Sequence, residues 1–505
     1  MRAREAVGNG IALARLPRAV RCELRYWLDL LLDHHGDDPL RQRRLLADAL
    51  DEMTGRPDLR AWAMIGLGTP SGAPGVSLSE HLRWLHQSLE VLPRLRDPAV
   101  RVLVLATVAT VLAAVGDPGW RRLADRMLAQ TDGLPDSTGE VRAYESVGCE
   151  ACYAGHHEIA RRLLTATRSG AVACRDRPLE LRSQARLVLL DYCNGRWEGL
   201  RERADFLAGE LAGSAEDAGA GMDVEAVSGC LALARGELDA SQRHLTSVMD
   251  RAELADGFDL LPIPANALIR QDVDAGDLDA ALATARRVLD GIEARGIWAP
   301  AARILPSLAQ ALVEADLPAD APTMLGTVRE RMRGLDVPLG PAATDHAQGF
   351  VTAGARQWLP AAAHFLSAAD RYEPLACRYE AAQAREQAAE CLFRAGDPRA
   401  GRVLRAAVAT YQHLGAEWDT ARAARTADRH GMALPAAPRG RHDSHQLSPR
   451  QRQVAHLAAT GLTNEEIARR LSLSARTVDK HVCAALRKLG LHSRRSLANH
   501  LSGPA

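Results

Sequence analysis

Residues 447–501 read LSPRQRQVAHLAATGLTNEEIARRLSLSARTVDKHVCAALRKLGLHSRRSLANHL, and this stretch predicts four short helices. Thr463 lies just before the second helix, and Glu466 lies three residues after Thr463, which is the spacing of a capping box. The link at 472–474 between the second and third helices has the length expected of a helix-turn-helix. Residues that can cap the four helices through a side-chain oxygen are Ser448, Thr463, Ser474 and Ser493.

The third of these helices divides into an apolar and a polar face. Helical spacing predicts that its apolar side chains pack on the first two helices. The apolar set is Val478, Val482, Ala485, Leu486 and Leu489, facing Val454, Leu457, Ile467 and Leu471. The opposite face contains Arg476, Asp479, Lys480, Cys483 and Arg487, side chains that could enter a DNA major groove.

Charge is distributed unevenly along the chain. The 505 residues have 63 Lys and Arg and 63 Asp and Glu, so the whole has no net charge. From Ala436 onward there are 12 basic and 4 acidic residues, a net charge of +8, which leaves −8 on residues 1–435. A basic C-terminal segment on an acidic body favours binding to phosphate groups over a merely solvated helix face.

The C-terminal segment resembles the LuxR-type (GerE-like) helix-turn-helix domain of bacterial transcription regulators. The motifs that carry the resemblance are LSPRQRQV at 447–454, GLTNEEIARRL at 461–471, RTVDKHV at 476–482 and LRKLG at 486–490. The resemblance implies a DNA-binding domain over 445–505, called the head below, with the helix-turn-helix proper at 463–482.

Carried over by position, the resemblance places Asp479, Lys480 and Cys483 at base edges. It places Arg476, Thr477, His481, Lys488 and residues 493–495 near phosphates. Many family members have a basic residue where this chain has Asp479, and that carboxylate could instead stabilise the N-terminus of its own helix. The full predicted DNA-binding set is Thr463, Asn464, Arg476, Thr477, Asp479, Lys480, His481, Cys483, Arg487, Lys488, Ser493 and Arg494.

A turn signal recurs about every forty residues between residues 30 and 410, and each one opens an amphipathic helix. Its first positions are Gly36, Gly75, Gly116, Gly155, Gly195, Gly236, Gly276, Ala315, Arg356 and Gly396. A helix hairpin of this length cannot bury its apolar face alone, so the units must stack. The sequence therefore predicts an all-α protein, a superhelical array of about ten tetratricopeptide-like hairpins followed by the four-helix head. We expect the array over 1–432 and a flexible linker over 433–444.

Large LuxR-family regulators resemble this arrangement but often begin with an ATPase module. A Walker loop needs a lysine on the nucleotide phosphates, and the only lysines here are Lys480 and Lys488. The glycine-rich run at 66–72 has the wrong spacing and no preceding strand. We therefore predict no nucleotide site and no cofactor.

Other reactive residues are few, so no catalytic or metal site is predicted and the protein is not expected to be an enzyme. Cys149 and Cys152 have a metal-like spacing without a second pair, which favours buried thiols in a helix.

His34–His35 and His156–His157 are expected to be solvated turn residues. Trp120, Trp197 and Trp358 are expected to pack between hairpins. No signal core or long uncharged apolar run is evident, so a cytoplasmic location without membrane contact is expected.

Two functions are consistent with the sequence. One is a sequence-specific transcription regulator whose array binds a protein or small-molecule effector. The other is a repeat scaffold for protein–protein interaction, in which the head serves recruitment or dimerisation. For a regulator, the expected partners are double-stranded DNA, RNA polymerase and a second copy of the chain. The family commonly pairs its heads through the fourth helix, here 494–501, which offers Leu497 and Leu501 for the contact.

Overall fold

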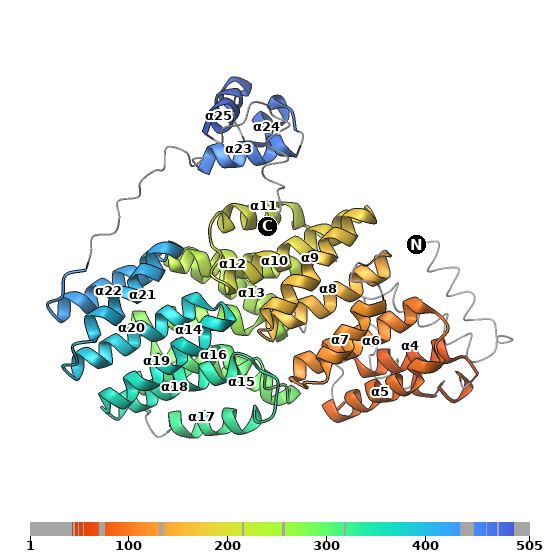
Figure 1. The fold of residues 1–505 in the computed structure, drawn as a ribbon, viewed down its shortest axis with the longest axis horizontal. Coiled ribbons are helices and arrows are strands. Elements are labelled where there is room, and N and C mark those ends of the chain that lie inside the picture. Colours follow the sequence, from red (N-terminus) through yellow and green to blue (C-terminus); the bar gives the residue numbers. More distant parts are fainter. Residues whose placement is uncertain are drawn as a thin grey trace. The chain divides into compact units, whose positions relative to one another are not determined.

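The computed structural model divides into two compact units, Met1–His430 and Gly431–Ala505 (Figure 1). Every regular element in the described residues is a helix, which confirms the all-α prediction. Short 3-10 helices lie before or between the α-helices at η1 (Leu50–Met53), η2 (Leu92–Arg94), η3 (Phe258–Leu260) and η4 (Glu373–Leu375). The structure describes residues 43, 46–48, 50–53, 55–69, 76–130, 135, 137–214, 217–254, 258–317, 320–434, 449–460, 462–471 and 474–488.

The first unit consists of helix hairpins stacked one after another. The nine hairpins in its described residues are α4 (Pro57–Gly68) with α5 (Leu78–Val91), α6 (Pro98–Val115) with α7 (Trp120–Gln130), α8 (Thr138–Tyr153) with α9 (His157–Ala173), α10 (Arg177–Cys193) with α11 (Leu200–Leu211), α12 (Ala218–Ala234) with α13 (Leu238–Leu254), α14 (Pro262–Ala275) with α15 (Leu278–Arg295), α16 (Ala301–Glu314) with α17 (Asp320–Arg331), α18 (Gly340–Gly354) with α19 (Trp358–Tyr372), and α20 (Arg378–Arg394) with α21 (Ala400–Leu414). A final helix, α22 (Glu417–Arg429), packs on α21 and also contacts α12.

The predicted turn signals coincide with a left-handed residue that ends the first helix of a hairpin. Gly116, Gly155, Gly195, Gly236, Gly276, Arg356 and Gly396 all have positive φ. At the remaining described position Ala315 has φ −78°, and the left-handed residue is the next one, Asp316, with φ 56°. Gly36 and Gly75 lie outside the described residues, so the number of repeats stays a prediction.

Glycines on the first helix of a hairpin allow the second helix to approach closely. A Cβ added at Gly349 of α18 would lie 2.5 Å from Phe365 Cε1 of α19, and one at Gly229 of α12 would lie 2.6 Å from Leu245 Cδ2 of α13. Both partners are buried in the array. A larger residue at either glycine would therefore push the two helices of that hairpin apart.

The array also winds back on itself, so that early hairpin turns contact later ones. The Asp336 backbone N–H donates to the Gly116 carbonyl at 2.6 Å, and the Trp120 indole donates to Asp336 Oδ2 at 3.1 Å. Arg303 of α16 donates to the carbonyls of Cys152 and Tyr153 at the end of α8. These contacts join segments about 150 to 220 residues apart in the chain.

His156 and His157 lie in these inter-turn contacts, and the expectation that they are solvated was wrong. Each is 6% exposed. His156 Nε2 lies 3.2 Å from the Asp336 carbonyl oxygen, and His157 Nδ1 lies 3.1 Å from that of Leu375. The turn signal places both residues at the surface of their own hairpin, but the later hairpins cover them. His34 and His35 lie outside the described residues.

The three tryptophans expected between hairpins are in contact with residues of other hairpins. Trp120 is fully buried against His156, with ring centroids 4.9 Å apart. Trp197 is buried and contacts Tyr379, also at 4.9 Å between centroids. Trp358 is half-buried beneath the Arg394 guanidinium of the next hairpin.

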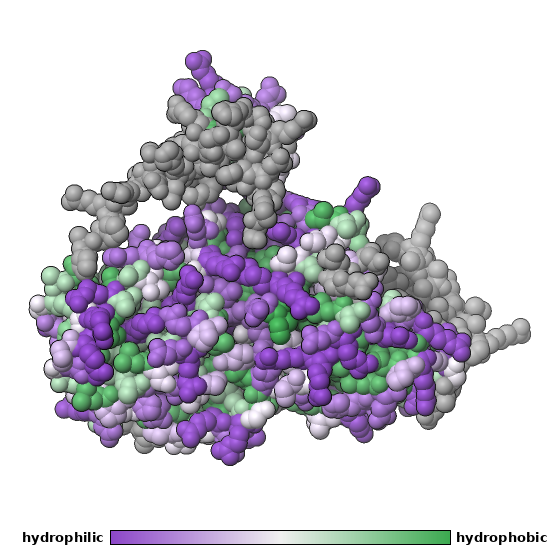
Figure 2. Space-filling model, viewed as in Figure 1, coloured by the Kyte–Doolittle hydropathy of each residue, from purple (hydrophilic) through white to green (hydrophobic). Residues whose placement is uncertain are grey.

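Among the described helices, α6 alone is long and apolar enough to cross a membrane by length and composition. Val104, Leu105, Val108 and Ala109 of this helix are fully buried, as in the core helix of a packed array. Hydrophilic side chains cover most of the described face in Figure 2, with scattered apolar residues between them.

Replacing Asp419 of α22 by Ala should destabilise the array. The buried Asp419 carboxylate accepts hydrogen bonds from Arg270 and Arg422, each at 2.8 Å, and from the Tyr379 hydroxyl at 2.6 Å. Its loss leaves buried guanidinium charge without a partner, and we expect about 3–5 kcal/mol less free energy of unfolding. Chemical denaturation followed by far-UV circular dichroism measures the change.

The matched control for this prediction is Asp250→Ala. Asp250 pairs with Arg287 at 2.7 Å but its side chain is 57% exposed, so its removal should change the free energy of unfolding by less than about 1 kcal/mol. Equal effects of the two substitutions would show that the Asp419 network does not stabilise the array.

Candidate nucleic-acid interface

The described part of the head is built from α23 (Pro449–Ala459), α24 (Asn464–Leu471) and α25 (Ala475–Lys488). The predicted packing is confirmed for all of its described members, since Val478 and Val482 of α25 lie in one buried cluster with Val454 and Ile467, and Leu471 and Leu486 pack at its edge. Leu489 lies outside the described residues. The head therefore has an apolar core of its own.

A capping box fixes the start of α24, as the sequence predicted. The Glu466 backbone N–H donates to Thr463 Oγ1 at 3.3 Å. In return, the Thr463 backbone N–H and hydroxyl donate to Glu466 Oε2 at 2.7 and 2.8 Å. These hydrogen bonds satisfy backbone donors that have no partner within the helix, and they fix the angle at which the chain enters α24.

The polar side chains of α25 lie on the face opposite the core. Arg476, Asp479, Lys480 and Cys483 are exposed, and His481 is half-buried. Thr477, Arg487 and Lys488 belong to α25, but their side chains are outside the described set, as are Ser493 and Arg494 entirely. The apolar and polar faces predicted for this helix are therefore confirmed where they are described.

Asn464 and Asp479 are joined by a hydrogen bond that the sequence interpretation missed. Asn464 Nδ2, at the start of α24, donates to Asp479 Oδ1 on α25 at 3.3 Å. Asp479 is the fifth residue of α25, beyond the first turn where a carboxylate is most stabilised by the helix N-terminus. The bond connects the two helices of the helix-turn-helix on its exposed side.

The other candidate sites give no competing chemistry in the described part of the chain. No group of three or more metal-ligating side chains is found there. Cys149 and Cys152 are free thiols in α8, and burial raises the pKa of Cys149 to about 11. Residues 66–68 of the glycine-rich run form the end of α4, and residues 70–72 lie outside the described residues.

Residues 445–501 match the family described as bacterial regulatory proteins of the luxR family, so the head is a LuxR-type helix-turn-helix domain. Over 60 residues the chain is 45% identical to the two-component response regulator PprB of Pseudomonas aeruginosa, covering 12% of this chain and 22% of that protein. Over 52 residues it is 48% identical to the nitrate/nitrite response regulator protein NarL of Escherichia coli, covering 10% of this chain and 24% of that protein. The match thus spans about a quarter of the length of these relatives.

Replacing Thr463 by Ala should loosen α24 without unfolding the array. Loss of an N-cap costs about 1 kcal/mol, so amide hydrogen exchange in α24 should become about fivefold faster. The measurement is hydrogen exchange on the full-length protein, read on peptides from α24 and from α12. Equal protection of α24 in the variant and the wild type would contradict the capping role.

Glu466→Ala and Glu465→Ala form a matched pair, because both carboxylates lie in the first turn of α24 and only Glu466 accepts from Thr463 among the described contacts. Glu466→Ala should loosen α24 more. The Thr463 backbone N–H and hydroxyl hold the pKa of Glu466 below its ordinary value of 4.5. The contribution of Glu466 is therefore complete above that value and is lost as the pH falls through the lower folded-state pKa.

Proposed function

We propose that this protein is a sequence-specific transcription regulator that places α25 in the DNA major groove under the control of its helical array. The observation that carries the proposal is the LuxR-type head, whose α25 packs one face into a core and leaves Arg476, Asp479, Lys480 and Cys483 exposed on the other. A helix presented in this way has the width and polarity to read base edges.

Within the groove, Lys480 and Cys483 would face base edges together with Asp479. The Asn464–Asp479 hydrogen bond supports a positioning role for Asp479, because a carboxylate held by a neighbouring amide keeps one oxygen free to accept from a cytosine amino group. Residues near the phosphates would be Arg476, Thr477, His481, Lys488, Ser493 and Arg494, and the proposed DNA-binding set is completed by Thr463, Asn464 and Arg487. The +8 charge of the C-terminal segment supports this electrostatic part of binding.

The array, over about residues 1–432, would act as the sensor of a cytoplasmic bacterial regulator. Stacked helix hairpins present long inner surfaces suited to a protein or small-molecule effector. The segment 433–444 would be the linker, with RNA polymerase and a second copy of the chain as further partners. The runner-up is a repeat scaffold whose head serves recruitment or dimerisation, and sequence-selective DNA binding discriminates between the two.

DNA binding by the full-length protein should weaken steeply as salt rises. With roughly six phosphates neutralised, the slope of log affinity against log salt should be about −5, since each contact contributes about −0.9. Fluorescence anisotropy with a fragment recovered from a genome-wide map of bound DNA measures it. A flat salt dependence, or equal affinity for unrelated fragments, would favour the scaffold function.

Lys480→Ala should reduce discrimination between the specific fragment and unrelated DNA by about 1–3 kcal/mol, because a lysine at a base edge contributes to the recognised sequence. The matched control is Lys488→Ala, the other lysine of α25, which we expect to weaken all fragments about equally. If Lys480→Ala leaves discrimination unchanged, the groove-facing side of α25 has been assigned wrongly.

Leu497→Glu should abolish cooperative binding to a two-fold symmetric site and spare the weaker binding to a half-site. Leu497 lies outside the described residues, and the expectation rests on the pairing of heads in the resembling family and on the symmetry of a dimer. Binding curves on whole and half-sites measure it. Cooperative binding by the variant, or full wild-type affinity on a half-site, would contradict a dimer made through this segment.

A further inference from the structure

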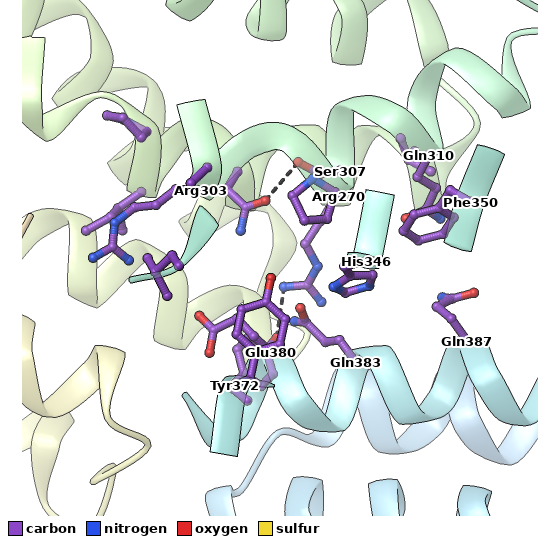
Figure 3. Close-up of a pocket in the computed structure, with 18 of the residues that line it drawn as sticks. Arg270, Arg303, Ser307, Gln310, His346, Phe350, Tyr372, Glu380, Gln383 and Gln387 are labelled. Carbon is purple, nitrogen blue, oxygen red and sulfur yellow. Dashed lines mark hydrogen bonds between the residues drawn. The ribbon is translucent and has the colours of Figure 1, made fainter. Parts of the chain in front are cut away.

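A cavity of about 100 Å³ lies inside the array, between the first helices of its later hairpins (Figure 3). Its walls come from α10, α14, α16, α18, α20 and α22, together with Tyr372 at the end of α19. A water-sized group needs about 10–15 Å³ of such space, so the cavity has room for roughly seven to ten non-hydrogen atoms.

Two opposite charges line the cavity without pairing with each other. Arg303 of α16 donates to the carbonyls of Cys152 and Tyr153 and lies 3.9 Å from Cys193 Sγ, and no carboxylate in the described residues is within ion-pair distance of it. Glu380 of α20 has a buried Oε2 that accepts no hydrogen bond within the described structure. Burial raises the pKa of Glu380, as expected for a desolvated carboxylate.

The other charged side chains that line the cavity have ion-pair partners, including Asp274 of α14, which lies 3.7 Å from the Arg425 guanidinium. Arg270 of α14 is bound by Asp419 at 2.8 Å and by the Tyr379 hydroxyl at 3.0 Å. Arg422 is bound by Glu386 at 2.7 Å and by Asp419 at 2.8 Å. Arg303 and Glu380 therefore remain as the charged groups of the cavity that have no ion-pair partner of opposite charge on a carboxylate or guanidinium in the described residues. The Cys193 thiol lies beside Arg303, and its hydrogen bond with Cys152 and the Arg303 charge lower the pKa of that thiol.

A second unpartnered polar atom lies in the same cavity. His346 of α18 is 4% exposed, and its Nδ1 meets no hydrogen-bond partner among the described residues. Burial lowers the pKa of His346 to about 3, so its ring is neutral. Figure 3 shows the ring beside the Arg270 guanidinium, and its centroid lies 5.5 Å from that of the Phe350 ring. Buried polar atoms of this kind are normally satisfied, so a polar group in the cavity would complete the site.

We propose that this cavity binds a small zwitterion with a free ammonium and a free carboxylate, of the amino-acid class. The carboxylate would bind the Arg303 guanidinium, and the ammonium would donate to Glu380. His346 and the Gln387 amide would bind a polar side chain of the ligand. A zwitterion matches the one unpaired charge of each sign, whereas an anion or a cation of this size would leave one buried charge unsatisfied.

A ligand here can affect α22, the last described helix before the head in chain order. Arg270 lines the cavity and binds Asp419 of α22, while Tyr379 of α20 donates to the same carboxylate at 2.6 Å. A shift of α14 or α20 on ligand binding therefore changes the hydrogen bonds that hold α22. The regulatory consequence rests on the proposed function, but binding itself does not depend on it.

The test is isothermal titration calorimetry of the full-length protein with the twenty free amino acids. Each amino acid that binds is compared with its carboxamide, which lacks the carboxylate, and its N-acetyl form, which lacks the ammonium. We expect at least one free amino acid to bind and both modified forms to bind at least about tenfold more weakly, as for a lost charged hydrogen bond. Dipeptides tested in parallel distinguish a peptide source from a free amino acid.

The isosteric variant Glu380→Gln should weaken binding of the same ligand at least about tenfold, while Glu417→Gln, an exposed position on α22 outside the cavity, should not change it. The proposal is overturned if no amino acid or dipeptide binds. It is also overturned if the carboxamide and N-acetyl forms bind as tightly as the free amino acid, and this comparison needs no protein variant. DNA affinity measured on the same samples separates the two failures, because DNA binding that persists without any ligand leaves the proposed function intact.

Discussion

A pair of α-helices cannot bury its own apolar face, and this constraint determines the organisation of the array. Each hairpin covers the exposed side of the one before it, so burial is complete only when many hairpins stack in sequence. Helices α6 and α12 show the result, because both are buried on most of their surface although neither lies at the centre of a globular core. Within single hairpins, the close approach of the two helices explains the glycines at 229 and 349, where the second helix of the hairpin occupies the space of a side chain.

Local patterns were sufficient to predict the elements and their order, because they depend on residues close together in the chain. The forty-residue spacing of the turns follows from a left-handed residue at the end of the first helix of successive hairpins, and the Thr463–Glu466 capping box from a spacing of three. At 315–316 the left-handed residue is Asp316 and not Ala315. Neither residue is glycine, so the sequence pattern does not mark which of the two adopts positive φ.

Contacts between distant hairpins were not predictable from the repeat. A repeat period identifies which unit stacks on the next, but not which later unit meets an early one when the array winds back. His156 shows this, since it looks like a turn residue in its own hairpin and is buried by the Asp336 segment about 180 residues later. In the head the Asn464–Asp479 bond was missed for a related reason, because it joins two helices and depends on the angle between them.

The buried charges of α22 link the end of the array to its interior. Helix α22 packs on α21 and contacts α12, and it is also held by Asp419, which is completely buried between Arg270 and Arg422. Such a network loses much of its stabilisation when one member moves, because each remaining charge becomes unpaired in a low-dielectric environment. Apolar packing alone would tolerate small shifts between helices more gradually. The last described helix of the array in chain order is therefore held by interactions that depend sharply on the positions of α14 and α20, two of the helices that line the cavity.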